Sequence, residues 1–178
     1  MTTIQVPEGY EYVLFTALIM SIECLFVGFL VAGKARMKIF NKEYLKDNFG
    51  PEHEKTFGQE IKPGGAPDMG SGYYASKLSY KDWYLFNNAQ RAHLNFVEMI
   101  ASSLMFLLVG GLYCPCIASG LGGLMIISRI LYATGYANKG PNGRLIGAVL
   151  NDVALLGLFI MGMIFVVKLM MKNSGCGK

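Results

Sequence analysis

The sequence has little charge: 16% of its 178 residues are Asp, Glu, Lys or Arg, whereas 53% are hydrophobic. The mean hydropathy is +0.38, and the charges are clustered rather than spread along the chain. The apolar stretches between the clusters approach or reach the roughly 20 residues that cross a bilayer core. This composition excludes a second soluble fold and predicts an all-α integral membrane protein, with one domain over residues 1–178.

Several features of other protein classes are missing. Four cysteines are too few and too scattered for a disulfide framework, and no His/Cys spacing suggests a metal site. The sequence contains no Gly-rich phosphate loop of a known spacing, and we expect no nucleic-acid partner. The first apolar run lacks a basic leader and a small-residue cleavage site, so we expect it to be retained as a membrane span.

Four apolar runs predict transmembrane helices, over about residues 12–32, 92–113, 117–136 and 144–167. The polar connection between the first two, residues 39–82, is rich in Gly, Pro and charge and contains no catalytic motif. A connection of this length is either functional or held in place by something else. The basic tail contains Cys176, a candidate palmitoylation site beside lysines.

The distribution of basic residues predicts how these helices are oriented. With four spans, the 39–82 connection and the 137–143 loop lie on one side, and both termini lie on the other. Twelve Lys and Arg residues fall within residues 34–91 and 139–144 on the loop side, against three on the side of the termini. The positive-inside rule therefore places both loops in the cytosol or its topological equivalent.

A stripe of polar residues opens the second span. Arg91, Asn95 and Glu98 are spaced by four and three, so they share one face of a helix. Ionisable groups at the mouth of a membrane helix are costly unless they are paired, and they often mark a functional site. Two interpretations follow from the stripe alone: an Arg–Glu pair that locks neighbouring helices together, or a binding site.

The predicted topology brings more polar residues to the same membrane depth. The loop-side ends of the other three spans carry Arg36, Arg129, Tyr132, Tyr136 and Arg144. A structural ion pair would not need these additional groups, so the pattern favours a binding site. Several guanidinium groups predict an anionic ligand, because Arg binds carboxylates through paired hydrogen bonds. Glutathione, a small peptide with two carboxylates, one amine and one thiol, fits this set of groups.

The same residues resemble a known family. The segment R-A-H-L-N-F-V-E, residues 91–98, is similar to a signature of the membrane-associated proteins in eicosanoid and glutathione metabolism, the MAPEG family. Segments 110–122 and 129–136 resemble its type 3 microsomal glutathione S-transferase branch, and the likeness covers about residues 10–40 and 86–158. The resemblance implies a four-transmembrane-helix bundle that assembles as a homotrimer, with glutathione bound between subunits near the cytosolic face.

The resemblance also implies roles for individual residues. Arg144 falls where the family's thiolate-stabilising arginine stands, which makes it the candidate catalytic residue. A free thiol has a pKa of about 8.5, and a fixed cation nearby favours the nucleophilic thiolate. The candidate glutathione-binding residues are Arg36, Arg91, His93, Asn95, Glu98, Tyr132 and Tyr136, together with Arg129 from its spacing.

The implied activity is a glutathione transferase and peroxidase. Glutathione is the expected co-substrate and no metal is expected; the second substrate is a lipophilic electrophile or lipid hydroperoxide from the bilayer. The endoplasmic reticulum membrane is the expected location, with a mitochondrial membrane as the alternative. The alternative function is a non-catalytic accessory subunit of a larger membrane complex.

Departures from the family pattern leave room for an altered substrate or a lost activity. The first connection is longer than in the type 3 relatives. Met99 stands where leukotriene-synthase members carry Tyr, although the type 3 branch also lacks that Tyr. Asp152 places a carboxylate inside the fourth span, and Glu23 places one near the middle of the first. Glu23 is expected either to pack against a polar neighbour or to be protonated.

Overall fold

The computed structural model describes residues 6–63 and 68–174, and over those residues it contains helices and turns without strands. The first rod consists of α1 (Tyr10–Val27), a π-helical turn η1 (Gly28–Gly33) and α2 (Lys34–Ile39). Two long helices follow later in the chain, α4 (Tyr80–Tyr113) and α5 (Pro115–Lys139). The last rod begins with the 3-10 turn η3 (Pro141–Arg144) and continues as α6 (Leu145–Ser174).

Four helical rods are long and apolar enough to cross a membrane: Tyr10–Ile39, Tyr80–Tyr113, Pro115–Lys139 and Pro141–Lys172. This confirms the predicted all-α bundle of four membrane helices. The rods extend beyond the apolar runs from which they were predicted. The second rod begins at Tyr80 rather than near residue 92, because Ser79 caps it by accepting a 3.1 Å hydrogen bond from the Asp82 backbone N–H.

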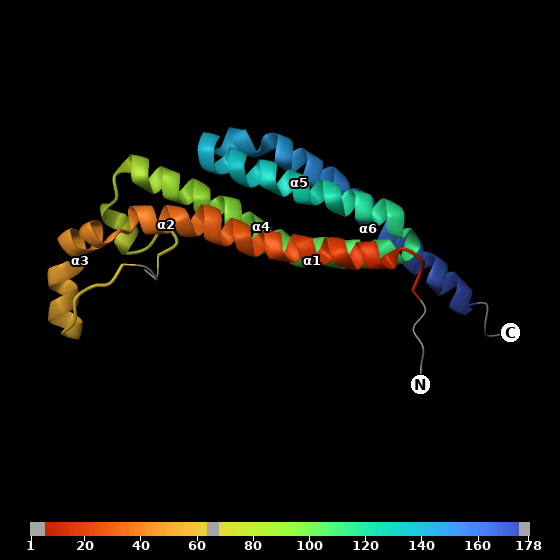
Figure 1. Ribbon diagram of the computed structural model, residues 1–178, viewed down its shortest axis with the longest axis horizontal. Coiled ribbons are helices and arrows are strands. Elements are labelled where there is room, and N and C mark those ends of the chain that lie inside the picture. Colours follow the sequence, from red (N-terminus) through yellow and green to blue (C-terminus); the bar gives the residue numbers. More distant parts are fainter. Residues whose placement is uncertain (1–5, 64–67, 175–178) are drawn as a thin grey trace.

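α4 and α5 form the centre of the bundle, and α1 and α6 each pack against both of them (Figure 1). The core contains Met20 from α1, Phe96 from α4, Met125 from α5 and Leu158 from α6, each at most 1% exposed. Large apolar side chains also cover the outside of the bundle, as expected for helices that face lipid. Examples of these outer side chains are Phe15, Phe29 and Ile146.

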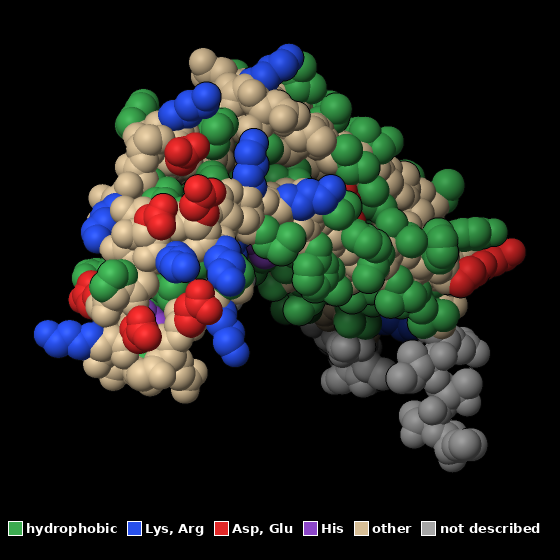
Figure 2. All heavy atoms as spheres, turned by 60° about the vertical axis from the view of Figure 1, so that its left-hand side comes forward, with side chains coloured by type: hydrophobic (Ala, Val, Ile, Leu, Met, Phe, Trp, Pro, Cys, Tyr) green, Lys and Arg blue, Asp and Glu red, His purple; other side chains and the backbone are tan. Residues whose placement is uncertain are grey.

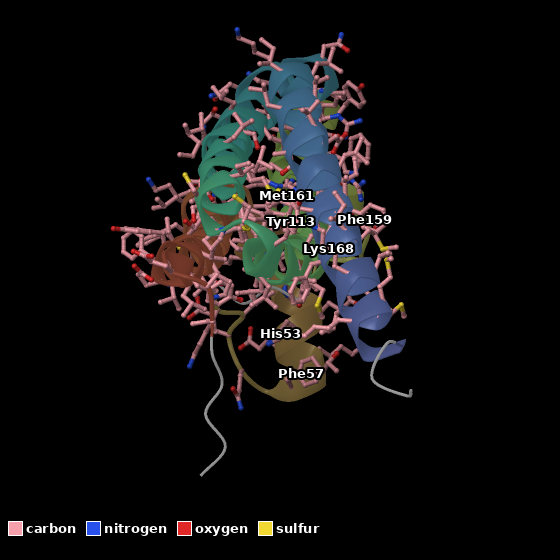
Figure 3. All side chains as sticks on the ribbon, turned by 90° about the vertical axis from the view of Figure 1, so that its right-hand side faces the viewer. His53, Phe57, Tyr113, Phe159, Met161 and Lys168 are labelled. Carbon is pink, nitrogen blue, oxygen red and sulfur yellow. The ribbon has the colours of Figure 1, made fainter. Side chains whose placement is uncertain are left out.

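The two ends of the bundle differ in character. At the end where α1 begins and α6 finishes, α4 turns into α5 through Cys114 and Pro115, and proline suits the first turn of a helix. There the Lys168 ammonium lies 4.7 Å from the centre of the Tyr113 ring, and Figure 3 shows both residues on neighbouring helices. The opposite end carries the candidate site residues and the long connection between α2 and α4.

The long connection is folded, whereas the sequence indicated only a polar stretch. It contains α3 (Lys42–Phe57) and the short 3-10 turn η2 (Tyr74–Lys77). The Asn41 side chain caps α3 by accepting a 2.9 Å hydrogen bond from the backbone N–H of Tyr44. A second hydrophobic cluster joins the connection to the first and second rods; its buried members are Phe40, Leu45, Phe49, Ile61, Ala75 and Phe86.

We call residues 41–63 and 68–79 the extramembrane unit, because they are polar on the outside and lie beyond the membrane rods. Lys, Arg, Asp and Glu side chains gather over this end, whereas hydrophobic side chains cover the bundle (Figure 2). The Tyr73 hydroxyl donates hydrogen bonds of 3.0 and 2.8 Å to the two carboxylate oxygens of Glu52. This hydrogen bond raises the pKa of Tyr73 above its ordinary value.

Candidate functional site

The centre of the candidate site is Arg129 on α5, whose side chain is only 3% exposed. Its Nη1 donates a 2.8 Å hydrogen bond to Oδ1 of Asn95 on α4. Its guanidinium carbon also lies 4.9 Å from the ring centre of Phe96 and 5.6 Å from that of Tyr132. Two helices therefore hold this cation with one strong hydrogen bond and two aromatic faces.

Arg144 approaches the same place from η3. Its Nη1 donates a 3.1 Å hydrogen bond to the Tyr132 hydroxyl, and its guanidinium carbon lies 5.2 Å from the ring centre of Tyr136. Tyr132 and Tyr136 are one turn apart on α5, and both are buried. The predicted convergence of the end of the third span with the start of the fourth is therefore present in the fold.

Close packing of α6 on α5 makes this approach possible. Gly147 lies so near the backbone of Ser128 and Tyr132 that a Cβ atom on it would overlap their main-chain atoms. Main-chain atoms cannot rotate out of the way as the end of a flexible side chain can. The absence of a side chain at Gly147 thus sets the distance at which Arg144 meets Tyr132.

A cavity of about 550 Å³ opens between the loop-side ends of the first, second and third rods, and a smaller one of about 270 Å³ lies at the cluster itself. The smaller cavity is the one that the chemistry favours, because both guanidinium groups border it. Its lining residues are Asn95, Met99, Arg129, Tyr132, Arg144, Leu145, Ala148, Asn151 and Asp152. Asp152, which departs from the family pattern, therefore lies at the site.

Some polar atoms beside this cavity have no hydrogen-bond partner among the described residues. They are Nε and Nη2 of Arg129 and Oδ1 of Asn151, all of them buried. Leaving such a group unsatisfied costs about 1–3 kcal/mol, so a polar ligand gains by binding there. Asn151 was not among the predicted site residues; the sequence signal for it is an amide beside Asp152 within an apolar span.

Glu23 on α1 also approaches Arg129 closely enough for their charges to interact. Both of its carboxylate oxygens are buried and lack hydrogen-bond partners within the described part of the chain. Arg129 is thus a polar neighbour of Glu23, which is one of the two predicted alternatives, although no hydrogen bond joins the two side chains among the described residues. The Glu23 carboxyl group therefore lies inside the bundle, on the α1 side.

Arg91 and Glu98, which share one face of α4 with Asn95, are exposed. Their side chains are 51% and 57% exposed, and Arg91 Nη1 lies 3.9 Å from Glu98 Oε1. Both residues belong to α4, so the pair does not lock neighbouring helices together, which was one of the two interpretations. Asn95 lies between them, about one helical turn from each. Asn95 lines the 270 Å³ cavity, whereas Arg91 and Glu98 are not among its lining residues.

Arg36 and His93 lie elsewhere. They line a pocket of about 390 Å³ between the first rod and α4, together with Gly28, Met69 and Gln90. His93 is two residues from Asn95, which corresponds to about 200° around a helix, so the two side chains leave α4 on opposite sides. The predicted residues are therefore divided between two faces of one chain. Asn95, Arg129, Tyr132 and Arg144 line the 270 Å³ cavity, whereas Arg36 and His93 line this second pocket. Cys176, the candidate lipidation site, lies outside the described residues.

The π-helical turn η1 forms one wall of this second pocket. A Cβ atom on Gly28 would lie 2.8 Å from Nε2 of His93, so the imidazole rests directly against the backbone of the first rod. Single π turns are rare and are often found at functional sites. Neither the π turn nor the contribution of Met69 was predicted, because both depend on how the connection and the first rod pack.

One family model matches the chain: the model of the MAPEG family, over residues 13–164. The match covers well over half of the sequence and includes all nine of the predicted site residues. It also includes α3 and the connection between the first two membrane rods.

Proposed function

Because the chain belongs to the MAPEG family of glutathione and eicosanoid metabolism, we propose that it is a membrane-bound glutathione transferase and peroxidase. The observation that carries this proposal is the contact of Arg144 with Tyr132 at the 270 Å³ cavity that Arg129 and Asn95 also line. Two fixed cations, a phenol and an amide at one membrane depth form a site for a polar, anionic ligand.

The charges of the site match the ends of glutathione. The guanidinium groups of Arg91 and Arg129 offer donors to its two carboxylates, and the unpaired Nε and Nη2 of Arg129 suit a paired contact. Glu98 offers an acceptor for the ammonium group, and Asn95 lies between the two ends of the stripe. These contacts bind and orient the peptide, and they leave its thiol directed to Arg144.

Arg144 then acts on the thiol. Its Nη1 lies 3.1 Å from the Tyr132 hydroxyl. The positive charge of this guanidinium favours the thiolate form of glutathione over the thiol. In a transferase reaction the thiolate forms a C–S bond with the electrophile, and the electron pair of the broken bond leaves with its leaving group. In the peroxidase reaction the thiolate attacks the hydroperoxide O–O bond and releases an alcohol; a second glutathione converts the resulting sulfenic acid to the disulfide and water.

The division of the site residues between two faces supports a shared site in an oligomer. Arg36 and His93 line the pocket between the first rod and α4, and His93 leaves α4 on the side opposite Asn95, so in one chain they do not share the cavity of Asn95. A neighbouring copy that presents its Arg36 face to the Arg144 face would complete the set. A closed ring is the simplest assembly of such unlike faces, and we propose the homotrimer implied by the family resemblance.

The second substrate enters from the membrane. The outer surface of the bundle is apolar along its length, so lipophilic electrophiles and lipid hydroperoxides reach the site from the bilayer while glutathione reaches it from water. The basic loop side would face the cytosol. The endoplasmic reticulum is the proposed membrane, and a mitochondrial membrane is the alternative.

A second candidate function is supported by the extramembrane unit. Phe57 and Tyr73 are 65% and 63% exposed on it, and this surface is not needed for the four membrane rods. Exposed aromatic side chains are typical of protein interfaces. A non-catalytic accessory subunit that binds a larger membrane complex through this unit is therefore the alternative.

The deciding experiment is a glutathione-conjugation and peroxidase assay on purified protein, combined with sizing of the native particle in mild detergent. Turnover by a particle of about three chains supports the enzyme. Co-migration with a much larger complex, without glutathione turnover, supports the accessory subunit.

A further inference from the structure

A methionine from the extramembrane unit reaches into the pocket of Arg36 and His93. The Met69 sulfur accepts a 3.4 Å hydrogen bond from Nη2 of Arg36 and a 3.8 Å hydrogen bond from Nε2 of Gln90. The guanidinium carbon of Arg36 lies 5.2 Å from the ring centre of Phe86. One side of the guanidinium is thus occupied by an aromatic ring, and the thioether receives one of its N–H donors.

The turn that carries Met69 is built around the buried carboxylate of Asp68, which is 1% exposed. This carboxylate accepts hydrogen bonds from three backbone N–H groups of the same segment. They come from Gly70 at 2.7 Å, Gly72 at 3.1 Å and Ala75 at 2.7 Å. Hydrogen bonds to an ionised acceptor are stronger than neutral ones. Asp68 therefore firmly links the residue before Met69 to the residues that follow it.

The turn is also attached to α4 on the side that follows Met69. The Gly70 carbonyl accepts hydrogen bonds of 2.8 Å from Nε1 of Trp83 and 3.3 Å from Nδ2 of Asn87. Gly70 has φ of +99°, a conformation that favours glycine, and the Asn87 side chain occupies the space a Cβ atom would take. The backbone at Met69 is therefore held from both sides, while its side chain is 50% exposed.

A thioether is a poor permanent partner for a guanidinium group. Sulfur is a weak acceptor, whereas a carboxylate forms short, charge-assisted and often paired hydrogen bonds with arginine. Methionine has three rotatable side-chain bonds and adapts its shape at little cost. An anionic group that enters this pocket therefore replaces the sulfur at Arg36 without disturbing the fixed backbone of the turn.

We propose that Met69 is a displaceable partner of Arg36 and thereby a residue that sets the affinity of the ligand site. This inference rests on the proposed function, since it takes glutathione as the ligand. One of the two carboxylates that Arg91 and Arg129 bind also reaches Arg36 of the neighbouring copy and there displaces the sulfur. The displaced thioether then stays in the pocket beside the ligand, and Leu25 and Phe29 supply other apolar parts of its lining. The extramembrane unit thereby contributes a ligand contact that the four membrane rods alone do not have.

The test is equilibrium dialysis of glutathione against the purified full-length protein and three variants. Met69→Glu places a carboxylate within reach of Arg36, and we expect it to weaken glutathione binding by about tenfold or more. Met69→Gln keeps the length of the side chain without charge, and we expect binding within about threefold of wild type. Met37→Glu makes the same charge change at a 67% exposed position of α2 and should bind like wild type.

Equal affinity of Met69→Glu and wild type would overturn the inference and leave the proposed function intact. A wild-type protein that binds no glutathione would overturn both, and is therefore a distinguishable result.

If Met69→Glu does not fold, oxidation of the wild type by hydrogen peroxide decides, with sulfoxide located by mass spectrometry. S-methylglutathione, which has no free thiol, should raise the oxidation rate of Met69 relative to Met37, because the sulfur loses its two donors. An unchanged ratio would overturn the inference.

Discussion

The Arg144 guanidinium donates a 3.1 Å hydrogen bond to the Tyr132 hydroxyl and thereby joins the start of α6 to the end of α5. Tyr132 in turn lies over Arg129, whose guanidinium carbon is 5.6 Å from the ring centre. The two cations are therefore coupled through one phenol ring. Arg129 is buried and positions the site, whereas Arg144 is partly exposed and borders the cavity where a ligand enters.

Arg144→Ala should lose most turnover while glutathione still binds, because the cation acts on the thiolate rather than on the ends of the peptide. We expect kcat to fall by about 10²–10³, in the range seen when one charge-stabilising group is removed. Arg144→Lys retains the charge without the planar donor set and should lose less. The measurement is kcat alongside the glutathione Kd; a large rise in Kd with kcat unchanged would assign Arg144 to binding instead.

Gly147→Val should separate α6 from α5, because its side chain would overlap the backbone of Ser128 and Tyr132. We expect a lower Tm and loss of turnover together, since Arg144 no longer meets Tyr132. Gly123→Val is the matched control: Gly123 lies within α5 and has open space where a Cβ atom would be. Equal effects of the two substitutions on Tm and turnover would show that the close packing at Gly147 is unimportant.

Arg91→Ala should raise the Kd for glutathione by about tenfold with kcat little changed, because it removes a partner of a carboxylate. Protein stability should hardly change, since an exposed ion pair such as Arg91–Glu98 contributes about 0–1 kcal/mol. Lys42→Ala removes a similar exposed pair, 3.7 Å from Glu60, and serves as the control with unchanged Kd. Dialysis and a thermal melt give both quantities; an unaltered Kd in Arg91→Ala would remove that residue from the site.

Phe49→Ala should loosen the extramembrane unit, because Phe49 is 2% exposed and packs against Tyr74 with ring centres 4.9 Å apart. Removing a buried Phe side chain typically costs about 3–5 kcal/mol. Phe57→Ala, on the same helix but 65% exposed, should change stability by less than about 0.5 kcal/mol. Trypsin cleavage at Lys55 should accelerate in Phe49→Ala alone, and similar cleavage of both variants would contradict the folded unit.

The number of membrane helices and the polar stripe were predictable from the sequence, because both depend on local patterns. An apolar run of sufficient length indicates a span directly, and spacings of three and four place Arg91, Asn95 and Glu98 on one helix face. The convergence of Tyr132 and Arg144 followed from the order of four spans. These predictions needed no knowledge of which helix packs against which.

The different environments of the arginines were not predictable, because they depend on helix rotation within the bundle. Arg129 is buried against Asn95, yet Arg91, one turn from Asn95, is half exposed. His93 lies on the opposite side of α4, although it is within the same signature. The fold of the 39–82 connection was missed for a related reason: α3 is a charged helix that contains Pro51, and its packing depends on Phe40 and Phe86 from outside it.

The most direct measurement is the ionisation of glutathione bound to the purified protein, followed by thiolate ultraviolet absorbance as pH is varied. Free thiols of pKa about 8.5 are mostly protonated at neutral pH. We predict that bound glutathione is largely thiolate at pH 7, and that Arg144→Ala returns its pKa toward the ordinary value. Bound glutathione that remains protonated at pH 7 in the wild type, or that ionises equally without Arg144, would contradict thiolate stabilisation by this arginine.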